Sequence, residues 1–590
     1  MKKHINIFRV VAYAVIGLAF AFDSVFAQDT IYNESVIINV GFNPIVNDAN
    51  KVVETPSIFD TSYSHIDLTF EKIDKGYQIR LKFDTIKPAQ VKGEPVAKLY
   101  NFHLKGGLGI GTSKVLGTGF VPYVQASYSS LRDRHLLYGV DVYSNSMIGS
   151  EKDFGYSGYT NNDINLWGKK IFNSYVASAN VFYSYNRHYF YGSQDYKELD
   201  IKKKDYRAAY HNVGFDLSYN KIERDNSFQH KADFSLNYTT SKLKSKELDL
   251  HLLLDAYKKV KFFGQTEQTL GLTFDYKHAF RKYKGDWDGL TAPLTYTAVE
   301  QLYLNAELND ISRFSSSRAL FNISPYFIFD YKKFHFFASL AIIPKINGYN
   351  DFQMLPTATI SFEVIPNILS LYGGLKSEVK LPTLYQITKE NPFVAPYIRL
   401  QDESDANLFV KAFLTISPNA QLSLEGGMTD MRNHHFYYNL PIDSANVLNT
   451  MNVEYANAQR YYATLETHFN ISTAFDLSLD ATIQKVDRKD DITAYYTPAF
   501  FASMKARYKY EDKLFITLSP TFKTKQKARF ILEEKELKPM IDINLDATYQ
   551  YNNNWSFFVD LQNLAFQKYE LYYNYPTYNF IFLLGATYKF

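Results

Sequence analysis

In residues 578–590, YNFIFLLGATYKF, every second position from Tyr578 to the last residue is apolar. Successive side chains of a β-strand point to opposite faces. One face of this segment therefore consists of Tyr578, Phe580, Phe582, Leu584, Ala586, Tyr588 and Phe590. The other face carries Asn579, Gly585, Thr587 and Lys589. The pattern predicts a strand with one face suited to an apolar environment.

The same alternation recurs in residues 541–551 and 475–484. A soluble β-sandwich also alternates, so two further features are needed to recognise a membrane barrel. The strand-like segments are about ten residues long, which suits a tilted crossing of a bilayer. Short and long connections also take turns, as in outer-membrane barrels. The short ones are residues 365–368, 417–420, 470–474, 510–513 and 551–554, and the long ones are 381–405, 432–456, 523–540 and 567–577.

The fold class predicted from this pattern is an all-β, transmembrane antiparallel β-barrel of about 22 strands, beginning at Tyr100. A first count gives about 23 segments, which does not suit a barrel of antiparallel strands, so residues 297–310 are assigned to a long loop. The glycine-rich residues 106–111 are assigned to the first strand rather than to a phosphate-binding loop. Residues 120–130, which follow, have the pattern of a strand and not of the helix that a phosphate loop needs.

The amino terminus has the layout of a secretory signal, with Lys2 and Lys3, an apolar run and then Val25-Phe26-Ala27. Residues 1–27 are therefore predicted to be a signal peptide and Gln28 the first mature residue. The chain has no cysteine, which excludes a lipid-anchored lipoprotein and a disulfide framework. Its 64 basic and 61 acidic residues nearly cancel, so no nucleic-acid partner is indicated.

The carboxy-terminal stretch resembles the closing strands of TonB-dependent receptors. The residues that carry this resemblance are Asn563-Leu564, Lys568-Tyr569-Glu570, Tyr575-Pro576, Gly585, Tyr588 and Phe590. Residues 381–385, LPTLY, and Asn391-Pro392 similarly look like a loop that these receptors carry after a mid-barrel strand. The resemblance implies a wide barrel in the outer membrane, at residues 100–590.

The amino-terminal segment departs from the pattern of that family. A TonB-dependent receptor carries a plug of well over a hundred residues, whereas residues 28–99 provide 72 positions. This short N-terminal periplasmic or lumenal segment is predicted to hold a β-hairpin at residues 66–83 and no full plug. Residues 34–40 have two interpretations, a TonB-contact strand or an ordinary edge strand, and engagement of TonB stays open.

Polar side chains on the inner face of the last strands are the main candidate site. Lumen-facing positions are predicted for Asp476, Asp480, Asp542, Asn544, Asp546, Asp560 and Gln562. These side chains are expected to shape access to the lumen, although wide barrels have polar interiors whatever their task.

No catalytic residues, metal ligands or cofactors are predicted. His434-His435 lies near Asp430 and Arg432, but neighbouring side chains on a regular strand point apart, so a metal-free loop is favoured. The acidic run 402–405, DESD, lacks the spacing of a calcium loop and is expected to be a solvated rim. Basic residues of predicted external loops are candidates for contact with lipopolysaccharide phosphates; they are Lys202, Lys203, Lys204, Lys523, Lys525, Lys527 and Arg529.

The sequence therefore predicts a non-enzymatic, integral outer-membrane barrel, whose partners are outer-membrane lipid and lipopolysaccharide. Its expected activity is passage of a solute or polymer across the outer membrane. The alternative is a non-transporting scaffold that holds the protein subunits of a secretion or assembly complex.

Overall fold

The computed structural model describes residues 100–112, 119–130, 135–150, 155–192, 203–204, 206–222, 228–261, 267–284, 314–344, 352–439, 449–530 and 533–590. The chain divides into two compact units, residues 1–98 and 99–590. The predicted signal peptide, the hairpin at 66–83, the 34–40 segment and the 297–310 loop lie outside the described residues. No helix in the described part of the chain is long and apolar enough to cross a membrane.

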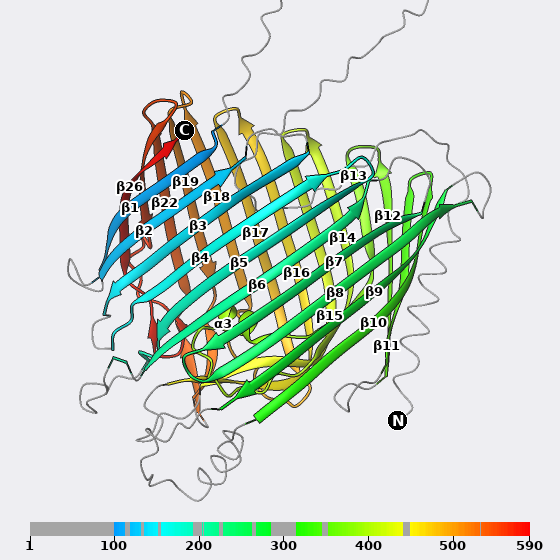
Figure 1. Ribbon diagram of the computed structural model, residues 1–590, viewed down its shortest axis with the longest axis horizontal. Coiled ribbons are helices and arrows are strands. Elements are labelled where there is room, and N and C mark those ends of the chain that lie inside the picture. Colours follow the sequence, from blue (N-terminus) through cyan, green and yellow to red (C-terminus); the bar gives the residue numbers. More distant parts are fainter. Residues whose placement is uncertain are drawn as a thin grey trace, which may run out of the picture. The chain divides into compact units, whose positions relative to one another are not determined.

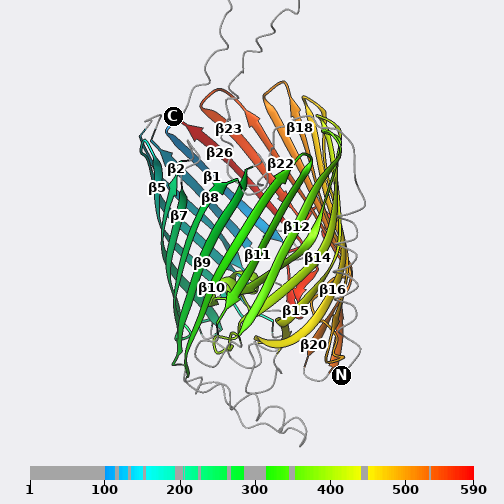
Figure 2. The ribbon, with the colours of Figure 1, turned by 90° about the vertical axis from the view of Figure 1, so that its right-hand side faces the viewer.

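The described residues of the second unit form one large antiparallel sheet that closes into a barrel (Figures 1 and 2). The sheet has 24 strands, of which β20 and β21 form a side hairpin, so 22 strands make up the ring. The first eleven are β1 (Phe102–Thr112), β2 (Gly119–Ser129), β3 (Leu136–Gly149), β4 (Tyr159–Ile171), β5 (Tyr175–Tyr189), β6 (Arg207–Lys221), β7 (Gln229–Ser241), β8 (Ser245–Val260), β9 (Gln268–Tyr283), β10 (Phe314–Tyr331) and β11 (Phe334–Ile343). The other eleven are β12 (Gln353–Ile365), β13 (Leu369–Lys380), β14 (Glu403–Ser417), β15 (Ala420–Asn439), β16 (Met451–Ser472), β17 (Phe475–Arg488), β18 (Phe500–Tyr510), β19 (Leu514–Lys523), β22 (Met540–Gln550), β23 (Trp555–Gln562) and β26 (Phe580–Lys589).

Closure depends on the first and last strands, which pair from His103↔Lys589 to Thr112↔Phe580. The barrel therefore has no free edge, so every strand can satisfy its backbone groups within the sheet. The predicted fold class and strand number are confirmed. The glycine-rich residues 106–111 lie in β1, and a strand follows them, as the sequence analysis expected.

The two faces of the wall differ as the alternation predicts. On β17, Ile483 is 60% exposed although it is a large apolar residue, whereas neighbouring Thr482 is buried and its hydroxyl lies 2.9 Å from that of Thr464 on β16. On β22, the apolar Ile541 and Tyr549 are likewise exposed. The outward face is thus apolar and unpacked, and the opposite face carries the polar contacts.

The two ends of the barrel also differ. Short turns join strands at the end that holds the carboxyl terminus, such as Ser417 to Ala420 between β14 and β15. Long connections lie at the other end, named here the long-loop end. These connections contain one short helix and four short strands: α3 (Leu384–Glu390), β20 (Gln526–Phe530), β21 (Glu533–Leu537), β24 (Glu570–Tyr572) and β25 (Tyr575–Pro576).

The predicted strand length and the predicted extent of the loop at residues 432–456 were both wrong. Strands of about ten residues were expected, but β15 and β16 run for 20 and 22 residues. Much of the predicted loop 432–456 is therefore strand, because the pairing of β15 with β16 continues to Asn439↔Met451. Sequence alternation is weak in this stretch, since both of its faces pack against other parts of the protein.

Replacement of an outward side chain by a charged one tests the assignment of faces. We expect Leu479→Arg to reduce the free energy of folding into lipid vesicles by about 2 to 4 kcal/mol, since the charge would enter hydrocarbon. Its neighbour Asp480 points to the other face and is the matched control: Asp480→Arg should cost far less. A refolding titration in which both variants lose equal stability would contradict the assignment.

Candidate functional site: a capped mouth

The segment between β13 and β14, residues 381–402, is named here the cap segment; it contains α3 (Figure 1). The helix begins at Thr383, whose hydroxyl accepts a hydrogen bond from the backbone N–H of Gln386, while the Gln386 side chain accepts one from the N–H of Thr383. This reciprocal capping box satisfies two backbone donors at the helix start. On its inner side, Leu384 and Ile387 are almost fully buried, at 0% and 2% exposure.

Arg281 of β9 fixes the cap segment to one side of the barrel. Its guanidinium donates hydrogen bonds to the backbone oxygens of Ile398 at 2.6 Å and Pro396 at 2.9 Å. The side chain is 2% exposed. Charged hydrogen bonds made in such a dry setting are strong, and loss of the donor would leave two buried carbonyl groups unpaired.

The neighbouring strands add two more charged contacts. Glu247 of β8 accepts a hydrogen bond from the backbone N–H of Leu384 at the start of α3. Arg318 of β10 donates to the backbone oxygen of Pro382 at 2.6 Å and lies 3.3 Å from the carboxylate of Asp402. Both side chains are buried, so the cap segment is held by a charged cluster on β8, β9 and β10.

The other side of the cap segment is held mainly by apolar packing. Phe393 stacks on Tyr575 with ring centroids 3.6 Å apart and touches His188 of β5 edge-on. The backbone of Ala395 donates to Met451 of β16 at 2.7 Å. The buried cluster around these contacts joins opposite walls of the ring and consists of Tyr189, Phe190, Tyr206, Ala208, Tyr210, Ile387, Phe393, Val394, Ala395, Ile398, Leu400, Tyr437, Tyr438, Met451, Val453 and Tyr575. The cap segment therefore crosses the mouth at the long-loop end.

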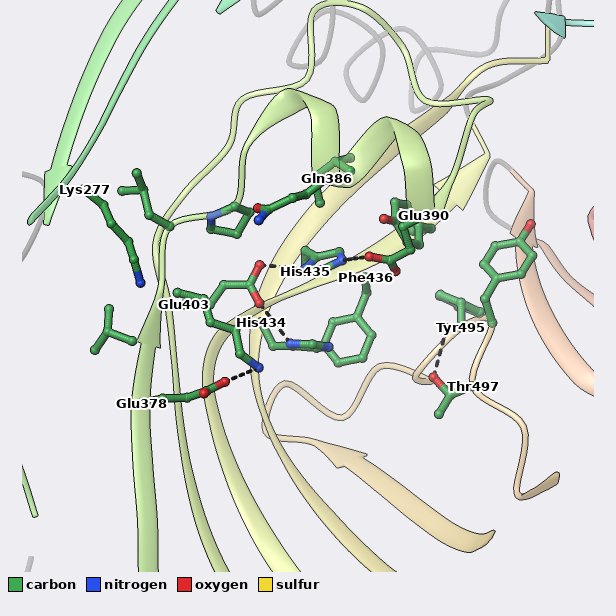
Figure 3. A pocket seen from close by; sticks show the side chains of 17 residues that line it. Lys277, Glu378, Gln386, Glu390, Glu403, His434, His435, Phe436, Tyr495 and Thr497 are labelled. Carbon is green, nitrogen blue, oxygen red and sulfur yellow. Dashed lines mark hydrogen bonds and ion pairs between the residues drawn. The ribbon is translucent and has the colours of Figure 1, made fainter. Parts of the chain in front are cut away.

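A cavity of about 700 Å³ lies beside the cap segment (Figure 3). Its lining comes from the cap segment with α3, from β9, β13, β14 and β15, and from the residues before β18. The lining side chains are Lys277, Glu378, Val379, Lys380, Leu381, Pro382, Gln386, Ile387, Glu390, Glu403, His434, His435, Phe436, Tyr437, Tyr495, Tyr496 and Thr497. Acidic, basic and aromatic groups thus converge on one space of the size that binds a small molecule.

His434 and His435, the pair singled out in the sequence analysis, lie in this cavity and face the same carboxylate. Nδ1 of His435 is 2.6 Å from Oε1 of Glu403, and Nδ1 of His434 is 3.2 Å from Oε2. Figure 3 shows Glu403 between the two imidazoles. The expectation that neighbouring side chains would point apart was wrong here. Asn433 adopts a left-handed conformation, with φ 52°, and the pairing with β16 shifts between Met431 and His434.

Glu390 of α3 approaches the same pair from the other side. Its Oε2 lies 3.5 Å from Nε2 of His435. Burial raises the pKa of Glu390, but the contacts with His435 and Tyr437 together lower it, so that the pKa stands below its ordinary value. His435 thus bridges a carboxylate on the helix and one on the wall. Glu403, His434 and His435 could together hold a metal ion, since one ligand atom of each lies within 4.8 Å of the others.

The acidic run 402–405 is not the solvated rim that was expected. Glu403 is only 3% exposed, and Ser404 is 6% exposed. Asp402 pairs with Arg318, and Asp405 lies 2.7 Å from Nζ of Lys380. Because β14 begins at Glu403, the run forms the junction of cap and wall and not a free loop. Asp430 and Arg432, also named from the sequence, pair with each other at 3.4 Å, and Asp430 pairs with Lys489 at 2.7 Å.

The predicted lumen-facing residues fall into two groups, away from the cavity. On β22 and β23, Asp546 and Asp560 are directly opposite each other. Near them, Asn544 donates to Asp542 at 3.1 Å and Gln562 to Asp560 at 3.0 Å. The second group, Asp476 and Asp480, lies on β17, and strands β18 and β19 separate it from β22.

Asp476 lies 3.4 Å from Arg507 and 3.5 Å from His468. All seven lie on the face opposite to the exposed apolar side chains, but none of them lines the cavity at the mouth. A role for them in shaping access stays a prediction.

Most of the basic residues assigned to external loops have acidic or aromatic neighbours in the structure. Lys525 and Lys527 pair with Glu536 and Glu534 across the β20–β21 hairpin, and Arg529 pairs with Glu454 of β16 at 2.8 Å. Nζ of Lys203 lies 3.2 Å from the ring centroid of Tyr156. Contact of these groups with lipopolysaccharide stays a prediction.

Several residues of the mouth were not found from the sequence. Arg281, Arg318, Glu247 and Phe393 gave no signal there, because each acts through partners more than sixty positions away. The helix had one signal, the spacing of Thr383 and Gln386.

The fold is a closed barrel of 22 strands. Solved structures of TonB-dependent siderophore receptors resemble it over 83% of the chain. Among solved structures, the siderophore receptor PirA from Acinetobacter baumannii matches with a TM-score of 0.61 at 12% identity, over 81% of its chain.

A mutant of the ferric enterobactin receptor PfeA from Pseudomonas aeruginosa, in complex with enterobactin, matches with a TM-score of 0.60 at 13% identity, over 82% of its chain. The FpvAI–pyocin S2 complex matches with a TM-score of 0.57 at 11% identity, over 73% of that chain. No family model and no curated protein sequence matches. The structural neighbours are receptors and not enzymes, and their likeness to this chain lies in the fold.

Proposed function

We propose that the protein is an integral outer-membrane barrel that mediates gated passage of a solute, with its long-loop end facing the exterior. The observation that carries this proposal is the cap segment, which folds across the mouth instead of standing clear of it. Two kinds of contact hold it, a charged cluster and an apolar one. A gate needs a closed state of this kind and a cavity beside it where the solute can bind.

A non-transporting scaffold is the second candidate. The buried cluster that joins opposite walls favours it, because a permanent closure would need such a core. In that case the long-loop end would serve to hold protein subunits of an outer-membrane complex. The two candidates differ in one respect: a gate must move the cap segment, and a scaffold need not.

A reversible lock on the cap segment separates the two. Val394 and Met451 are partners in a parallel β-bridge. Neighbouring strands lie about 4.8 Å apart, within the span of a disulfide. Because the chain has no cysteine, the double variant Val394→Cys, Met451→Cys would carry one defined crosslink. The test uses a strain from which the gene has been deleted and measures the growth or uptake defect caused by the deletion. We expect the double variant to correct this defect only after an external reductant is added. Each single variant should correct it without reductant.

Full restoration by the oxidised double variant would contradict gated passage. Stoichiometric subunits that co-purify from native membranes with the locked protein would then support the scaffold.

A further inference from the structure

We propose that Glu403, His434 and His435 form a binding site for one divalent first-row transition-metal ion, and that Glu390 orients His435 from the outer shell. The site is independent of whether the barrel transports a solute. Its three ligand atoms come from the first residue of β14 and from two adjacent positions of β15.

The backbone is built for this convergence. Adjacent residues on a regular strand cannot chelate one ion, since their side chains lie on opposite faces. Here both imidazoles nevertheless reach the Glu403 carboxylate, directly after an irregular stretch in which the register with β16 shifts between Met431 and His434 and Asn433 is left-handed. The side chain of Asn433 donates to the backbone oxygen of Asp402 at 2.7 Å, and its own N–H donates to Asn457 at 2.9 Å. The irregular backbone is therefore held by contacts on both sides.

The chemistry of the donor atoms selects the class of ion. Two imidazole nitrogens and one carboxylate oxygen suit zinc and its first-row neighbours, whereas calcium and magnesium prefer oxygen alone. Three protein ligands leave a coordination position for water or for a solute in the cavity. Nδ1 of His434 is buried and, within the described part of the chain, has no partner in hydrogen-bond geometry, although Oε2 of Glu403 is 3.2 Å away.

The outer shell matches as well. Histidines that bind a metal through one ring nitrogen usually donate the other N–H to a carboxylate, which fixes the tautomer. Glu390 lies 3.5 Å from Nε2 of His435, which leaves Nδ1 to face Glu403 and His434 (Figure 3). The Glu403 carboxylate is 3% exposed, so a cation at this position would also offset the cost of a buried negative charge.

Equilibrium dialysis of the full-length, tag-free protein in detergent tests the proposal, with Zn²⁺ as the probe after removal of metals by a chelator. We expect one Zn²⁺ per chain, and no competition from Ca²⁺ in excess. Glu403→Gln and His434→Gln should weaken binding by more than the roughly 10- to 100-fold that loss of an outer-shell partner costs. Glu390→Gln should fall within that 10- to 100-fold range and keep the stoichiometry of one.

The control is a histidine that faces one carboxylate without a second histidine. His251 lies 2.7 Å from Asp275 in the barrel wall, and His251→Ala should leave the affinity unchanged. The heat-dependent mobility of each variant in detergent gels shows whether the barrel has folded, so lost binding is not confused with lost structure. Absence of a stoichiometric Zn²⁺, equal competition by Ca²⁺, or an equal loss in His251→Ala and Glu403→Gln would overturn the proposal.

Discussion

Replacement of the cap segment by an Asn-Gly turn is expected to convert a closed barrel into a wide conducting pore. The change is simple because Lys380 and Glu403, the residues on either side of it, are direct partners in the β13–β14 pairing. A two-residue turn therefore suits the junction. Removal of residues 381–402 deletes the six cap members of the buried cluster, and the contacts of Tyr575 with Tyr191 and Asn449 would then still join opposite walls. The wall itself should persist, since its backbone pairing is a closed ring.

Single-channel recording in planar bilayers measures this effect directly. We expect no sustained current from the wild-type barrel and a large, stable current from the variant. The β20–β21 hairpin offers a matched control, because Lys523 and Met540 on either side of it are also direct partners. Replacement of residues 524–539 by the same turn should leave the barrel closed. A variant that lacks the cap segment, folds and still passes no current would show that another part of the chain fills the lumen.

Deletion of residues 28–85 is expected to raise the conductance further in the barrel that lacks the cap segment. A ring of about 22 strands encloses a lumen wide enough to be plugged, and the sequence predicts that this segment provides only part of a plug. In the barrel that keeps the cap segment, the same deletion should change the current little, because the cap segment still closes the mouth. Four proteins are compared: the wild type, the variant without the cap segment, the variant without residues 28–85 and the variant without both. The heat resistance of the barrel in detergent should be the same for all of them.

An unchanged current after the deletion, in the barrel without the cap segment, would exclude this segment from the lumen. Its more fitting task would then be to bind a periplasmic partner. Recordings from both backgrounds are needed, since a result from the capped barrel alone would not distinguish the two placements.

Local patterns made the wall predictable. The two faces of β17, β22 and β26 could be read from single residues, because the side chain of each position is fixed by its parity along the strand. The ring closure and the number of strands followed from loop lengths and from the rule that antiparallel barrels are even. None of these inferences needed to know which distant residues touch.

The mouth was not predictable in the same way. That Arg281 bonds the carbonyl groups of Pro396 and Ile398 depends on contacts across more than a hundred positions, which no periodicity records. The helix α3 is only seven residues long, too short for a periodic apolar stripe to stand out. His434 and His435 were assigned to opposite faces by the alternation rule for strands, yet both reach Glu403, directly after the irregular backbone at Asn433.

The length of β16 places the mouth well away from the lipid. At about 3.3 Å per residue and a tilt of about 40°, its 22 residues rise by roughly 55 Å, more than twice the apolar band of about 25 Å that a bilayer needs. On the side of β15 and β16, the wall therefore extends beyond the apolar band at the long-loop end. If the cap segment opens as we propose, its motion there displaces no acyl chains, and we expect the energy of opening to be independent of bilayer thickness and of hydrophobic mismatch.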